Sequence, residues 1–185
     1  PGWFITPESQ TARDVYKSLK DEYGNVDVFI DLHHQGMYYV EGTDDEVTLS
    51  LSAQFVSDPN TSEGAKYAEY AENYRYDYSR QLNVAAYNEL QSYGNSKFTN
   101  ISLYSQGLDL PGTALGSYAL NGSGTVLFEV RGQTQMMGQK EKGQLVKSVE
   151  QGLTGIIEAV ADGSVETLNP EDYEKIPLTS NKPTN

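Results

Sequence analysis

The segment VDVFIDLHHQG, residues 26–36, decides the fold class of this 185-residue chain. Residues 26–32 are rich in β-branched and apolar side chains, a pattern typical of a strand buried in the centre of a sheet. The strand passes through Asp31 and runs into the only two histidines of the sequence, His33 and His34. Side chains adjacent on a strand point to opposite faces of the sheet, so one metal ion can easily be reached by only one of these histidines.

Helical and extended patterns alternate along the rest of the chain, which predicts an α/β protein. We expect a mixed, largely parallel sheet with helices on both faces, that is, an α/β/α sandwich. The expected elements are a helix capped by Thr6 and closed by Gly24, the strand at 26–32, a half-exposed strand at 47–51, a helix over 65–94, a strand ending near Glu129, and a helix over 140–162. Glycines at 143, 152 and 155 argue against continuity of the last helix.

The composition excludes several classes of function. Thirteen basic and 26 acidic residues give a net charge of −13, which repels phosphate backbones and anionic lipid. We therefore expect no nucleic-acid partner. The chain has no cysteine, which excludes disulfides and cysteine-based zinc sites. No apolar run approaches the roughly 18 residues needed to span a bilayer, so no membrane insertion is expected.

Two features suggest chemistry, and the residues alone leave both open. Glu129 lies within the apolar stretch TVLFEVRG, and buried carboxylates are rare unless they are paired or functional. It is either a salt-bridge partner of Arg131 or a general base with a shifted pKa. The histidines lack H-x-x-E or H-x₃-H spacing, and this slightly favours histidines held by hydrogen bonds over metal ligands.

Four segments, taken in chain order, resemble the zinc metallocarboxypeptidases of the carboxypeptidase A-like family. They are TPESQTARDVYKSL (6–19), DVFIDLHHQG (27–36), ISLYSQGLDLPGTALGSYALNG (101–122) and VLFEVRG (126–132). The second resembles the family's D-[LI]-H strand, and the fourth resembles its F-E-[LV]-R strand. The resemblance covers residues 1–168 as the C-terminal portion of the catalytic domain, and leaves residues 169–185 as a tail or linker.

The resemblance implies zinc-dependent hydrolysis of C-terminal peptide bonds, by a secreted or extracellular enzyme. It makes His33 a zinc ligand and Glu129 the general base that activates water on Zn²⁺. Tyr104 matches the tyrosine that closes over the substrate, a peptide with a free C-terminus. Ala114 stands where the family sets its side-chain preference, and a small apolar residue there implies an apolar substrate side chain.

The departures from the family pattern are specific. No H-x-x-E is present, because His33 is followed three residues later by Gly36 and His34 by Met37. Leu115 occupies a position that is often acidic in the family. We therefore expect the remaining zinc ligands to come from a missing N-terminal part of the catalytic domain or from a covering partner chain, and the isolated chain to be inactive. Two alternatives stay open: a non-catalytic peptide- or glycan-binding relative of the same fold, and an unrelated α/β domain.

Overall fold

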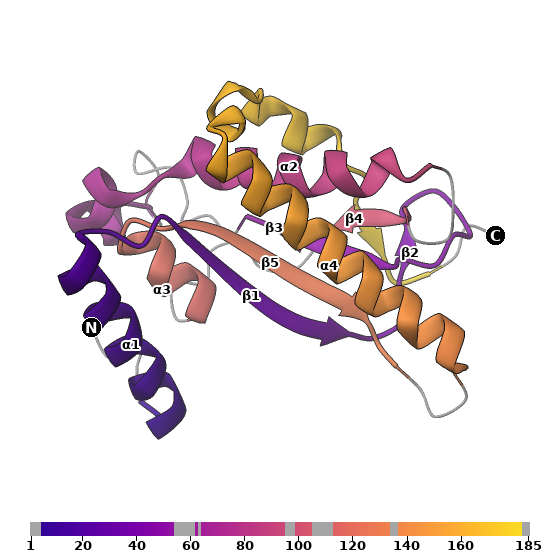
Figure 1. Cartoon of the computed structure of the whole chain (residues 1–185), viewed down its shortest axis with the longest axis horizontal. Coiled ribbons are helices and arrows are strands. Elements are labelled where there is room, and N and C mark those ends of the chain that lie inside the picture. Colours follow the sequence, from indigo (N-terminus) through magenta and orange to yellow (C-terminus); the bar gives the residue numbers. More distant parts are fainter. Residues whose placement is uncertain are drawn as a thin grey trace.

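A computed structural model describes residues 5–53, 62, 64–94, 99–104, 113–133 and 137–182 (Figure 1). The elements are α1 (Pro7–Tyr23), β1 (Val28–Gln35), β2 (Tyr39–Val40), β3 (Leu49–Ser52), the 3₁₀ helix η1 (Gly64–Asn73), α2 (Tyr76–Ser92), β4 (Ile101–Leu103), α3 (Ala114–Leu120), β5 (Gly124–Arg131), α4 (Gln139–Ala161), the 3₁₀ helices η2 (Ser164–Thr167) and η3 (Pro170–Lys175), and β6 (Thr179–Ser180). No helix within these ranges is long and apolar enough to cross a membrane.

The predicted α/β class is confirmed. Four strands form a mixed, mostly parallel sheet in the order β1-β5-β3-β4, with β1 parallel to β5, β3 parallel to β4, and β3 antiparallel to β5. Helices α2 and α4 cover one face of this sheet, while α3 and α1 lie on the other side (Figure 1). Strands β2 and β6 form a separate antiparallel pair.

The prediction of a central position for β1 is wrong for the described sheet, in which β1 is an edge strand paired only with β5. Its first apolar residues pack on the two faces of the sheet, whereas Leu32 is 53% exposed. Phe29 packs against Tyr118 of α3, with ring centroids 4.1 Å apart, and Ile30 packs against the main core on the other face. An edge strand that packs on both faces over part of its length therefore gives the same apolar pattern as a central one.

The main core lies between the sheet and helices α2 and α4. Leu49, Leu51, Val126 and Phe128 point into it from the strands and are fully buried. Helix α4 runs unbroken despite its glycines. A Cβ at Gly152 would lie 2.7 Å from the Phe128 ring, so this glycine allows the helix to approach the sheet closely.

Strand β3 is buried on both faces, which corrects the prediction of a half-exposed strand. Ser50 is fully buried and Ser52 is 2% exposed, although both alternate with leucines. The C-terminal segment accounts for the difference, because Thr179 lies within hydrogen-bond distance of the Ser50 hydroxyl. Buried serines with partners and exposed serines give the same alternation in the sequence.

Residues 169–182 pack onto the domain, in contrast to the predicted tail or linker from residue 169. Tyr173 and Ile176 are buried in a second apolar cluster, and Arg80 of α2 donates to Glu171 and Glu174 at 2.9 and 2.6 Å. The polar composition of this segment gave no sign that two of its side chains are buried, or that a buried arginine of α2 binds two of its carboxylates.

Candidate functional site

His33 and Glu129 are direct partners in the register of β1 and β5. Partners on adjacent parallel strands point to the same face of the sheet, and the two strands lie roughly 4.8 Å apart. The two residues singled out by the resemblance, which lie far apart in the sequence, are thus neighbours on the face of the sheet opposite the main core.

The imidazole of His33 is held by a carboxylate. Its Nε2 lies 3.0 Å from Oδ1 of Asp31, two residues earlier on the same strand face. A carboxylate on one ring nitrogen fixes the tautomer and directs the other nitrogen toward a ligand, as in many metal sites. The His33 side chain is about half exposed, so a ligand can approach the ring from solvent. His34 follows on the other face of β1, as the alternation along a strand requires.

Glu129 is buried, and no Lys or Arg of the described residues forms an ion pair with it. It is 8% exposed, and its Oε2 has no hydrogen-bond partner among the described residues. Burial raises its pKa above the ordinary value; His33 opposes this shift, and the negative charge of Asp31 adds to it. Arg131 forms its ion pairs with Glu46 and Glu141 at 2.7 and 3.6 Å, so the salt-bridge explanation of Glu129 loses its expected partner.

Tyr104 joins this group and Ala114 is placed apart from it. Tyr104 directly follows β4; burial raises its pKa, and the nearby charge of Glu129 raises it further. Ala114 is the first residue of α3 and is exposed, and the described contacts do not connect it to His33, Glu129 or Tyr104. Three of the four predicted site residues are therefore brought together.

The donor atoms present fit part of a zinc site. No group of three or more histidine, aspartate or glutamate residues within the described ranges is arranged to hold a metal ion. A catalytic zinc needs three protein ligands and an open position. His33, oriented by Asp31, suits one ligand, and further ligands would have to come from outside these ranges.

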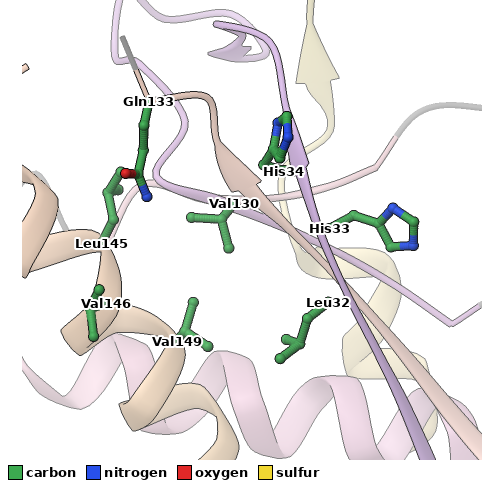
Figure 2. A pocket seen from close by; sticks show the side chains of 8 residues that line it. All are labelled: Leu32, His33, His34, Val130, Gln133, Leu145, Val146 and Val149. Carbon is green, nitrogen blue, oxygen red and sulfur yellow. The ribbon is translucent and has the colours of Figure 1, made fainter. Parts of the chain in front are cut away.

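An apolar groove of about 500 Å³ lies on the other face of the sheet, between β1 and α4. Leu32, Val130 and Val149 line it, while the ring of His33 points away from these side chains (Figure 2). Glu129 belongs to the opposite face, because its neighbour Val130 points into the groove. The groove and the buried carboxylate are thus two separate features of the same pair of strands.

Sequence reasoning missed a group of buried polar residues that lies on the same face of the sheet as Glu129. Gln35, Ser50, Ser102 and Thr179 are buried and joined by hydrogen bonds on the Glu129 side. The signal that pointed to them was weak, since a serine between leucines on a short strand is equally typical of a solvent-facing position.

The fold and the site define an α/β domain with a histidine–carboxylate pair on adjacent parallel strands. No protein-family model matches the chain, and no match to it was found among curated proteins or solved structures.

Proposed function

We propose that this chain carries part of the catalytic centre of a zinc metallocarboxypeptidase, which hydrolyses C-terminal peptide bonds once the remaining zinc ligands are supplied. The observation that carries the proposal is the direct register of His33 with Glu129. The sequence resemblance assigned a ligand and a base to two strands far apart in the sequence, and these two residues lie side by side on adjacent strands. Two short motifs that matched the family by chance would have no reason to lie on adjacent strands in register.

The chain's own residues have defined roles in this reaction. When bound, zinc polarises the scissile carbonyl and makes the attacking water more acidic. Glu129 accepts the proton of that water and returns it to the leaving amine, and a pKa raised by burial brings the carboxyl closer to the pH at which a base works best. Asp31 orients His33, and Tyr104, whose pKa is raised by burial and by the charge of Glu129, is the candidate substrate contact.

Within the described part of the chain, β1 has a strand partner on one side only, and this supports the idea that the centre is completed from outside the chain. Apolar side chains that line the groove beside this edge are exposed, among them Leu32 of β1 and Val146 of α4 at 53 and 64%. Unpaired strand edges flanked by apolar surface are normally covered in native proteins. A covering segment, from an N-terminal part or a partner chain, would lie beside His33 and is the natural source of further ligands.

Zinc binding by the 185-residue chain is the first test. With one strong ligand, the chain should bind zinc weakly and below one equivalent by elemental analysis after dialysis. His33→Ala should abolish this binding, and the matched control His34→Ala should leave it unchanged. Retention of zinc by the first variant and its loss in the second would overturn the assignment of His33.

Activity is tested in the longest natural reading frame that contains this chain, by measuring the release of C-terminal amino acids from peptides. Glu129→Gln should lower turnover by about 10³-fold, within the range for loss of a general base, and His34→Ala should have little effect. Peptide binding without turnover would favour the non-catalytic relative of the fold. Robust turnover by the 185-residue chain alone would contradict the proposal that its centre is incomplete.

A further inference from the structure

A polar row crosses the sheet at the level of Glu129. The register aligns His33 of β1 with Glu129 of β5, Glu129 with Ser50 of β3, and Ser50 with Ser102 of β4. Both serines are fully buried. Register partners share a face, so the candidate base has the imidazole on one side and a buried hydroxyl on the other.

Three hydroxyls, those of Ser50, Ser102 and Thr179, are joined by hydrogen bonds beside Glu129. Nε2 of Gln35 donates to Ser50 Oγ at 2.8 Å, and Thr179 Oγ1 donates to the carbonyl of Leu103 at 2.5 Å. Between these ends, Ser102 Oγ lies 3.1 Å from Ser50 Oγ and 2.7 Å from Thr179 Oγ1, and Ser50 Oγ lies 3.2 Å from Thr179 Oγ1. Because the Thr179 proton is used by the Leu103 carbonyl, Thr179 Oγ1 accepts from the serine hydroxyls.

The Gln35 amide is oriented with its nitrogen toward Ser50 and its oxygen Oε1 turned away from it. That oxygen is buried and has no hydrogen-bond partner among the described residues.

The path of the Gln35 side chain brings it beside Glu129. Gln35 is on β1 and its partner Ser50 is on β3, so the side chain spans two strand spacings of roughly 4.8 Å each and crosses β5. Ser50 lies opposite Glu129, while Gln35 is level with Arg131. The amide must cross β5 between these two levels, next to the Glu129 carboxylate on the same face.

We propose that Gln35 is a positioning residue for Glu129: its amide, anchored to the Ser50–Ser102–Thr179 hydroxyls, lies over β5 and keeps the Glu129 carboxylate turned toward His33. The physical cause is that an amide oxygen repels a carboxylate oxygen, so the carboxylate favours the side away from Gln35. The catalytic meaning of this contact rests on the proposed function, but the contact itself is independent of zinc.

The test uses the 185-residue chain labelled with ¹³Cδ-glutamate, without zinc, and observes the Glu129 carboxyl resonance, identified by its loss in Glu129→Gln. Gln35→Met keeps the length of the side chain and removes its polar atoms, and should move this resonance by more than its linewidth. Ser102→Ala removes one of the two hydroxyls that Ser50 contacts and should move it less, in the same direction. Ser148→Ala, a buried serine of α4, should leave it unchanged.

A double-mutant cycle separates positioning from general loosening. Urea midpoints of Gln35→Met, Glu129→Gln and the double variant should be non-additive, as for residues in contact. An unmoved resonance in both Gln35→Met and Ser102→Ala, or additive midpoints, would overturn the proposal. Ser102→Ala keeps the test open if Gln35→Met does not fold. Since neither readout involves zinc or turnover, failure here and failure of the peptidase proposal are distinguishable.

Discussion

Glu129→Gln should make the chain more stable at neutral pH, and this outcome distinguishes a functional carboxylate from a structural one. The glutamate is 8% exposed, its Oε2 lacks a hydrogen-bond partner among the described residues, and Arg131 is engaged elsewhere. Glutamine keeps the shape and removes the charge. A buried polar group without a partner costs about 1–3 kcal/mol, and more when it is charged. Because the amide is also left without a full set of partners, we expect a gain of about 1 kcal/mol.

The gain should depend on pH with a defined sign. Burial raises the folded-state pKa of Glu129 above its ordinary value of 4.5, so the folded chain binds this proton more tightly than the unfolded chain. The corresponding stabilisation is fully present below the ordinary pKa and is lost as the pH rises through the folded-state pKa. The advantage of the glutamine variant should therefore be largest at about pH 7.5 and shrink toward pH 5.

Urea unfolding with a chelator present measures this effect without interference from zinc. A gain of about 1 kcal/mol moves the midpoint upward by about 0.5 M for a slope near 2 kcal/mol/M. The matched control Glu150→Gln removes an exposed carboxylate that is paired with Lys147, and should change stability by less than about 0.5 kcal/mol. A Glu129→Gln variant less stable than the parent at neutral pH would refute the reasoning and make Glu129 a structural partner.

Two further predictions concern the packing that supports the site. Gly152→Ala should destabilise the chain by about 1–3 kcal/mol in urea unfolding, because the new methyl would overlap the Phe128 ring. The control Gly143→Ala lies in the same helix, and its methyl meets nothing within 4 Å. It should stabilise the chain by about 0.5–1 kcal/mol. Arg80→Ala should lower the free energy of unfolding by about 2 kcal/mol, because two charge-assisted hydrogen bonds are lost, and should increase proteolytic cleavage within η3. The control Lys175→Ala breaks an exposed ion pair and should change neither stability nor cleavage.

Local signals in the sequence predicted the elements that they specify directly. Thr6 accepts from the backbone of Ser9 at the start of α1, and Gly24 closes the helix with a φ of 84°. The turn at residues 121–122 and the apolar run before Glu129 likewise located β5. Capping and turn residues act within a few positions, so one sequence is sufficient to interpret them.

Features that depend on distant partners could not be predicted in the same way. Ser50 and Ser102 are buried because Thr179 reaches them from the C-terminal segment. The edge position of β1 depends on which strands pair, a choice that its own side chains do not encode. Sequence reasoning placed His33 and Glu129 on strands, but their direct register follows from the parallel pairing of β1 with β5.

The distribution of hydrogen bonds along the polar row supports a division of labour within it. At one end Ser102 and Thr179 are fully used in binding the C-terminal segment to the sheet. At the other end Gln35 Oε1 and Glu129 Oε2 are buried without partners among the described residues, beside the open edge of β1. Folding alone gives no reason to leave two acceptors unsatisfied next to a well-satisfied chain of hydroxyls. A site that keeps a base available for a proton donor gives such a reason, because an acceptor that already has a partner within the protein would bind that donor less well.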